Sequence, residues 1–146
     1  MRTNGLPRAA LVLGLGRSGK AVAAMLAGRG VRLAVSDDDA GSLEAWRGEG
    51  ERLDQRAALG CLDSFDSVVV SPGVPRLHPL LAAATAAGVA VVSELELAAS
   101  LLEAPVIAIS GTNGKSTTVS LLAGMLTAAG LRAPAAGNIG NPLSAV

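Results

Sequence analysis

The sequence predicts an α/β fold in which helices cover a parallel β-sheet. Half of the 146 residues are apolar, which is enough for a packed core. Trp46 and Phe65 are the only aromatic residues, so the core must be built from Ala, Val, Leu and Ile, the usual filling of layered α/β proteins. Short apolar runs also alternate with stretches of helical periodicity, which is the pattern of βαβ units.

The first βαβ unit lies at the N-terminus. The apolar run Ala9 to Leu13 predicts a buried strand, and the glycine-rich loop GLGRSG follows at 14–19. A helical pattern then continues to Gly30, which ends the helix. Residues 31–36 predict a second strand, which leads into the acidic cluster at 37–39.

The alternation of strand and helix continues beyond this unit. Residues 41–60 are polar, with a weakly helical stretch at 43–47, and predict a poorly packed connection. A run of valines predicts a strand at 67–71, an Ala/Leu-rich segment predicts a helix at 77–87, and 89–92 predicts another strand.

A second unit of strand, loop and helix follows. The capping-box pattern at 93–96 predicts a helix that reaches Leu102. An apolar run predicts a strand at 106–110, the loop GTNGKS follows at 111–116, and a helical pattern then continues to Gly130.

Two glycine-rich loops in one chain predict two domains. We expect a Rossmann-like domain over 1–93 and the start of a P-loop ATPase domain over 94–146. Asn141 and Pro142 have the pattern of a helix cap and first helical residue, yet the sequence stops at Val146, about one turn later. A P-loop domain needs further strands and metal ligands, so we expect the N-terminal portion of a longer protein.

The loop at 111–116 predicts a phosphate site. Its glycines allow backbone N–H groups to face inward, and the following helix N-terminus adds partial positive charge. Lys115 can then reach the outer phosphates, and Ser116 can present its hydroxyl to Mg²⁺. Ile109 stands where the strict pattern has glycine, so the loop is a shortened variant. The alternative is a glycine-rich turn with a solvated lysine.

The first loop, in the N-terminal βαβ unit, predicts a diphosphate site. Gly14, Gly16 and Gly19 match the dinucleotide fingerprint, and Asp37 lies where a ribose hydroxyl would be held. NAD, FAD or any nucleoside diphosphate would satisfy this loop, and a purely structural βα turn is the alternative. The turn at 71–73 follows a strand at the edge where such sheets bind ligands, although a plain turn explains it equally well.

The remaining composition excludes several classes of protein. The net charge is zero and the charges are scattered, so we expect no nucleic-acid binding. The longest apolar runs are too short for a membrane span. Cys61 is the only cysteine, which fits a reducing, cytoplasmic setting.

Three further features have structural interpretations. We expect His78 to be a surface or capping residue and Glu94 to favour a helix N-terminus. We expect the cluster at 137–142 to form at least a turn and a cap.

Five motifs occur in order along nearly the whole chain: GLGRSG at 14–19, Asp37-Asp38, VSPGVP at 70–75, GTNGKST at 111–117 and GNIGNP at 137–142. Together they resemble the Mur ligases of bacterial peptidoglycan synthesis. GTNGK is shared with folylpolyglutamate synthetases, whereas the first loop combined with SPG and GNIG resembles the D-glutamate-adding branch. The alanine-adding relative usually carries histidine where this chain has Asn113.

The resemblance implies two ligand sites. The residues implied for the UDP-sugar are Leu15, Gly16, Arg17 and Ser18 at the diphosphate, Asp37, Ser71, Pro72 and Gly73 at the uracil end, and Asn138 at the muramoyl-alanine. The residues implied for MgATP are Gly111, Thr112, Asn113, Gly114, Lys115, Ser116 and Thr117.

The implied reaction phosphorylates the terminal carboxylate of UDP-N-acetylmuramoyl-L-alanine, and the amine of D-glutamate then attacks the acyl phosphate. Lys115 would be catalytic and Ser116 would bind Mg²⁺. The family's other metal ligands and its amino-acid-binding domain have no counterpart in these residues. We therefore expect this chain to be inactive on its own. We also expect it to be a monomer. An NAD-binding or dehydrogenase module, a P-loop protein with no synthetic role, and a purely structural α/β module are the rival interpretations.

Overall fold

A parallel sheet of five strands forms the centre of the part of the chain that the structure describes. The computed structural model describes residues 5–137, 139 and 141–146. The strands are β1 (Ala9–Leu13), β2 (Arg32–Ser36), β3 (Glu51–Arg52), β4 (Ser67–Val70) and β5 (Ala90–Ser93). Their order is β3-β2-β1-β4-β5, and every pair is parallel. This confirms the predicted α/β fold with a Rossmann-like sheet.

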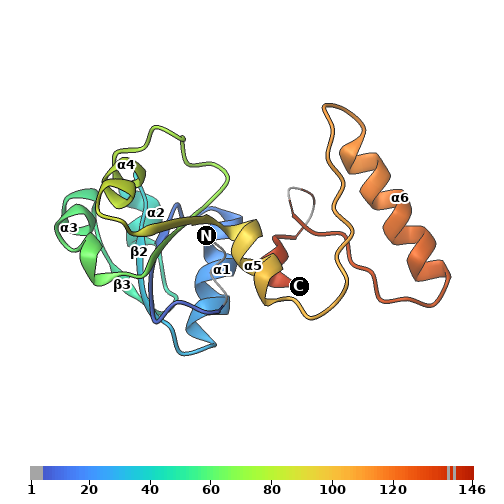
Figure 1. The fold of residues 1–146 in the computed structure, drawn as a ribbon, viewed down its shortest axis with the longest axis horizontal. Coiled ribbons are helices and arrows are strands. Elements are labelled where there is room, and N and C mark those ends of the chain that lie inside the picture. The colour runs from blue at the N-terminus through green and yellow to red at the C-terminus, as the bar shows by residue number, and fades with distance from the viewer. Residues whose placement is uncertain (1–4, 138, 140) are drawn as a thin grey trace.

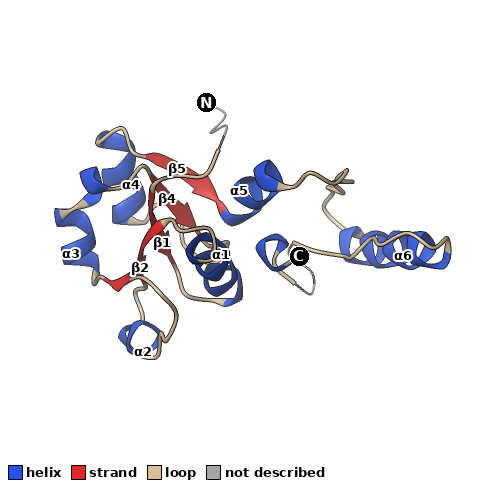
Figure 2. Ribbon diagram, turned by 90° about the horizontal axis from the view of Figure 1, so that it is seen from below, coloured by secondary structure: helices blue, strands red, loops and turns tan. Residues whose placement is uncertain are grey.

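Helices cover both faces of the sheet. They are α1 (Arg17–Ala27), α2 (Ala40–Glu44), α3 (Gln55–Gly60), α4 (Pro79–Ala86), α5 (Glu94–Leu101) and α6 (Lys115–Ala128), with 3₁₀ turns η1 (Leu62–Ser64) and η2 (Leu143–Ala145). Figure 2 shows α1 and α5 on one side of the sheet and α3 and α4 on the other, and each side has its own cluster of buried apolar residues.

Strand β1 shows why the sheet forms where the apolar runs are longest. Ala10 and Val12 point into the cluster beneath α1, whereas Leu11 and Leu13 point into the cluster beneath α4. All five residues of β1 are buried because successive side chains of a central strand enter opposite, covered faces. A continuous apolar run is the sequence signature of such a strand.

The prediction of a poorly packed connection over 41–60 was wrong in part: most of these residues are exposed, but the segment is not irregular and Trp46, Leu53 and Ala58 are buried. This segment forms α2, the edge strand β3 and α3. The carboxyl groups of Asp39 and Asp54 cap the two short helices by accepting the N–H groups of Ser42 and Ala57, each at 2.7 Å. Trp46 is only 9% exposed and packs in the core. The helices are short and the strand has two residues, so no periodic pattern was long enough to show them.

The predicted strand at 106–110 does not form in this structure. Residues 102–135 make an arm that leaves the sheet, carries α6 and returns at η2 (Figure 1). Val106 and Ile107 lie in this arm, 54% and 62% exposed. A strand needs hydrogen-bonding neighbours, and no described strand lies beside this segment. Helix α6 confirms the helix predicted after the loop, but none of its residues is buried.

None of the helices in the described residues combines the length and apolar character required to cross a bilayer.

Asp66 fixes the start of the central strand. Its Oδ2 accepts the N–H groups of Arg8 at 2.7 Å and Ala9 at 2.9 Å. The Ala9 hydrogen bond first, and then the Arg8 hydrogen bond, hold the pKa of Asp66 below its ordinary value of 3.8. A carboxylate with a lowered folded-state pKa stabilises the fold above the unfolded value and loses this effect as the pH falls through the folded value.

We therefore expect Asp66→Asn to unfold more readily than the wild type at neutral pH, with a difference that narrows as the pH falls below 3.8. Urea unfolding of both proteins across this pH range measures the difference. A difference that stays the same at every pH would show that the charge of Asp66 does not matter.

Candidate functional site

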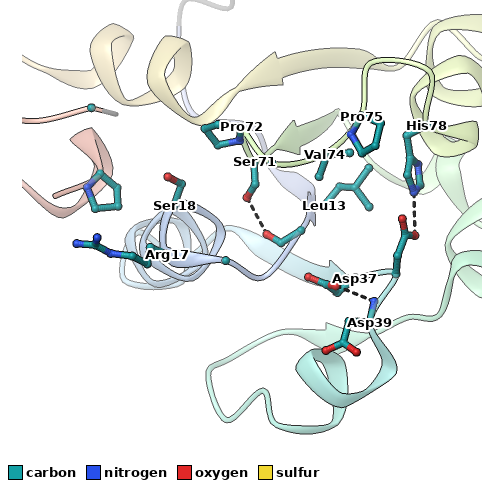
Figure 3. A pocket seen from close by; sticks show the side chains of 16 residues that line it. Leu13, Arg17, Ser18, Asp37, Asp39, Ser71, Pro72, Val74, Pro75 and His78 are labelled. Carbon is teal, nitrogen blue, oxygen red and sulfur yellow. Dashed lines mark hydrogen bonds and ion pairs between the residues drawn. The ribbon is translucent and has the colours of Figure 1, made fainter. Parts of the chain in front are cut away.

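A pocket of about 570 Å³ lies where the carboxyl ends of the three middle strands meet. Gly14 follows β1, Asp37 follows β2 and Ser71 follows β4. In open parallel sheets this edge is where ligands bind. The pocket brings together most of the residues implied for the UDP-sugar (Figure 3), namely Gly16, Arg17, Ser18, Asp37, Ser71, Pro72 and Gly73.

The glycine loop brings the N-terminus of α1 close to the sheet. Gly14 has a φ of +88°, which L side chains rarely adopt. At Gly19 a Cβ atom would lie 1.7 Å from the carbonyl oxygen of Gly14, so only glycine fits. Helix α1 begins at Arg17 with Gly16 as N-cap, and no side chain caps it. The N-terminus of α1 lines the pocket, and the partial positive charge at a helix N-terminus favours an anion there.

Asp37 holds the glycine loop in place. Its Oδ2 accepts the N–H of Leu15 at 2.5 Å, and its Oδ1 accepts the N–H of Asp39 at 2.8 Å. The side chain of Leu15 is 2% exposed and packs in the core, and Leu15 is not among the pocket-lining residues. The structure thus places Leu15 under the loop, with its N–H already paired to Asp37.

Ser71 joins the end of β4 to the same loop. It is 6% exposed, and its Oγ donates to the carbonyl oxygen of Gly14 at 2.7 Å. The N–H of Val74 donates to the carbonyl oxygen of Ser71 at 3.1 Å and closes a turn. Pro72 and Gly73 at the centre of this turn form a wall of the pocket.

His78 is a pocket residue that the sequence analysis did not place there. It is 5% exposed, so the predicted surface position was wrong, whereas the predicted capping role is confirmed. Its Nδ1 accepts the N–H of Leu80 at 3.1 Å, which caps α4, and its Nε2 lies 2.9 Å from Oδ1 of Asp38. Because Nδ1 accepts, the hydrogen of the neutral ring is on Nε2, which donates to Asp38. The ring thus ties the acidic loop to α4 (Figure 3).

His78→Asn should separate these two roles. Asparagine can still cap α4, because it is a favoured N-cap residue, but it is too short to reach Asp38. We expect a loss of about 1 kcal/mol in the free energy of unfolding for Asn and about twice as much for Ala, which loses both contacts. Urea unfolding measures both. Equal losses for the two variants would show that the contact with Asp38 contributes nothing.

The two ends of the glycine and asparagine cluster, Gly137 and Pro142, return to this pocket. Gly137 and Pro142 line it beside the N-terminus of α1. The N–H of Gly137 donates to the carbonyl oxygen of Asn141 at 2.9 Å, and η2 then packs against α1 and α5. Pro142 is the N-cap residue of η2, one position after Asn141, the predicted cap, and Leu143 is the first residue of η2. Asn138, implied for the muramoyl-alanine, lies outside the described residues.

The loop at 111–116 lies apart from this pocket, on the arm. Gly114 has a φ of +77° and forms the N-cap of α6 without a side-chain cap. The ammonium group of Lys115 donates to the carbonyl oxygens of Gly111 and Thr112. The described part of the chain contains no group of three or more His, Cys, Asp or Glu side chains that could hold a metal ion. Among the described residues, Ser116 therefore has no such group beside it.

The comparisons with known proteins agree with one another. Residues 8–93 match the model of the Mur ligase MurD-like N-terminal domain. The chain is similar to UDP-N-acetylmuramoylalanine–D-glutamate ligases, with 47% identity to the protein of Trichlorobacter lovleyi over 90% of this chain and 44% to that of Pelobacter propionicus over 91%. The ligase of Mycolicibacterium vanbaalenii is 43% identical over 92%.

The chain spans about a third of the length of these relatives, 31% of the first two and 30% of the third. The family match itself covers the whole sheet and most of the pocket, from the start of β1 to the end of β5. The chain therefore belongs to the Mur ligase family, in which its residues 8–93 form a MurD-like N-terminal domain.

Proposed function

We propose that this chain is the nucleotide-sugar-binding part of a UDP-N-acetylmuramoylalanine–D-glutamate ligase, and that its pocket binds the UDP of UDP-N-acetylmuramoyl-L-alanine. The observation that carries the proposal is that the N-terminus of α1, where the helix dipole favours an anion, lines a pocket whose other walls come from the ends of β2 and β4. The names of the similar ligases support the choice of substrate.

In this proposal the diphosphate lies at the start of α1. The N–H groups of Arg17 and Ser18 would donate to phosphate oxygens, and the guanidinium of Arg17 would add positive charge. The uridine would lie between Asp37 and the turn at 71–73. A carboxylate has about four lone-pair sites, so Asp37 can accept a ribose hydroxyl while it holds the loop. Leu15 would not contact the ligand, but its side chain in the core and its hydrogen bond to Asp37 would hold the loop in shape.

MgATP would bind at the second loop, in residues Gly111 to Thr117. The parts present fit a nucleotide phosphate: α6 has an uncapped N-terminus, and a lysine is its first residue. Lys115 would hold the outer phosphates, Ser116 would bind Mg²⁺ and Thr117 would support the loop. When bound, MgATP supplies the phosphoryl group that activates the alanine carboxylate toward the amine of D-glutamate. We propose a cytoplasmic, monomeric protein that binds no nucleic acid.

Ligand-dependent thermal stability tests the proposal, because a ligand that binds only the folded state raises the melting temperature. UDP and UDP-N-acetylmuramoyl-L-alanine should each raise the melting temperature of the chain, and NAD should not. Stabilisation by NAD without stabilisation by UDP would instead support a dinucleotide-binding module.

A pair of arginine variants localises the site. Arg17 lines the pocket, whereas Arg56 is exposed on α3, on the opposite face of the sheet, and the two replacements by alanine change the charge equally. We expect Arg17→Ala to weaken UDP binding about tenfold or more, the loss typical of a hydrogen bond to a charged group, and Arg56→Ala to leave it unchanged. Isothermal titration calorimetry measures both, and equal affinities would exclude the pocket as the UDP site.

A further inference from the structure

Glu94 is a buried acidic side chain that the proposed ligand contacts do not use. It is the first residue of α5 and is 2% exposed. Burial of a carboxyl group is costly unless hydrogen bonds offset the loss of water. Its Oε1 accepts the backbone N–H of Ser144 at 2.7 Å, across 50 positions of sequence. Glu94 thus joins the sheet domain to the C-terminal segment.

This hydrogen bond lies next to a wall of the pocket. Ser144 is in η2, which packs against α1 and α5. Shortly before η2, Ala136 pairs with Asn141, and the N–H of Gly137 donates to the carbonyl oxygen of Asn141. Gly137 and Pro142 line the pocket together with Arg17 and Ser18. An anchor at Ser144 therefore determines how closely Gly137 and Pro142 approach the start of α1.

The order of groups in a nucleotide sugar shows what this wall would contact. In the proposed orientation, uridine lies between Asp37 and the 71–73 turn, and the diphosphate lies at the start of α1. The sugar is attached to the far end of the diphosphate, so it extends away from the uridine, past the N-terminus of α1. Gly137 and Pro142 line the pocket there, because η2 packs against α1. UDP alone ends at the diphosphate and so has no group to place against these two residues.

We infer that Glu94 is a positioning residue that holds Gly137 and Pro142 against the sugar side of the bound nucleotide sugar. The inference rests on the proposed function. The alternative explanation is that Glu94 only stabilises α5 through the helix dipole, which favours negative charge at a helix N-terminus. The two roles differ in what they require: the dipole effect needs the charge, whereas the anchor needs only an oxygen that accepts the Ser144 N–H.

Calorimetric titration of the 146-residue chain with UDP and with UDP-N-acetylmuramoyl-L-alanine separates the two roles. Glu94→Ala should weaken binding of the UDP-sugar roughly tenfold and change UDP binding less than about twofold. Glu94→Gln, whose amide oxygen can accept the same N–H, should recover most of the loss. Ser144→Ala is the matched control, because it keeps the backbone N–H and removes only a buried hydroxyl that has no partner in the described structure. It should bind both ligands as the wild type does.

Amide hydrogen exchange of residues 136–146 measures the anchor without a ligand. It should accelerate in Glu94→Ala and stay slow in Glu94→Gln. Equal loss of UDP and UDP-sugar binding, no loss in either, or a Gln variant as impaired as Ala would each overturn the inference. If the wild type binds neither ligand, the proposed function fails and so does the sugar-side role, whereas the exchange data still decide whether Glu94 anchors the turn.

Discussion

Gly19→Ala is expected to abolish UDP binding and to lower the free energy of unfolding by about 3 kcal/mol or more, at the upper end of the range for overpacked sites. The added Cβ would lie 1.7 Å from the carbonyl oxygen of Gly14 and 2.7 Å from Oγ of Ser71. The first of these atoms is backbone of the glycine loop, so it cannot turn aside as a long side chain can. Either α1 must move away from β1 or the loop must open.

Gly28→Ala is the matched control on the same helix. Gly28 has helical dihedral angles, and a Cβ there would lie 3.4 Å from the nearest atom, the carbonyl oxygen of Ala24. We expect this variant to be as stable as the wild type, or slightly more so. Urea unfolding and calorimetric titration with UDP measure both variants. A Gly19→Ala protein with wild-type stability would show that α1 does not need to approach the sheet so closely.

Asp37→Ala is expected to weaken UDP binding about tenfold or more and to lower the free energy of unfolding by about 1–3 kcal/mol. The N–H groups of Leu15 and Asp39 both lose their acceptor. Leu15 belongs to the glycine loop, so the loss of its hydrogen bond loosens the loop. Asp37→Asn keeps one acceptor oxygen and should fall between the wild type and the alanine variant.

Asp63→Ala provides the control for charge, because Asp63 is exposed on η1 at a distance from the pocket. It should match the wild type in both urea unfolding and UDP titration. If Asp37→Ala bound UDP as well as Asp63→Ala does, the carboxyl group of Asp37 would be unnecessary for shaping the loop or for holding the nucleotide.

The sheet and the glycine loop were predictable from the sequence because each depends on local signals. The fully buried strand β1 produced a continuous apolar run, and the tight loop after it required glycines at fixed positions. The resemblance to the Mur ligases implied one ligand site for Asp37 and Ser71, and the observed strand order explains why, because it places the ends of β2 and β4 on either side of the loop after β1.

The parts that could not be predicted depend on contacts between distant segments. The sequence around His78 does not indicate its contact with Asp38, which lies 40 positions away. The sequence around Glu94 likewise does not indicate its hydrogen bond with Ser144. The apolar pattern at 106–110 predicts a strand, but a pattern cannot tell whether neighbouring strands are present. The conformations of α2 and α3 depend on the caps at Asp39 and Asp54, which act on helices too short to show a period.

The return of Gly137 and Pro142 to the start of α1 also sets an order of events during synthesis. Translation runs from the N-terminus, and domains generally fold as they emerge. The sheet and the glycine loop precede the arm in sequence, so a nascent chain can form them while the last wall of the pocket is still inside the ribosome. A growing chain therefore has a pocket that is open on one side. If the pocket binds the nucleotide sugar as proposed, full retention of this ligand begins only after the arm has emerged and folded back.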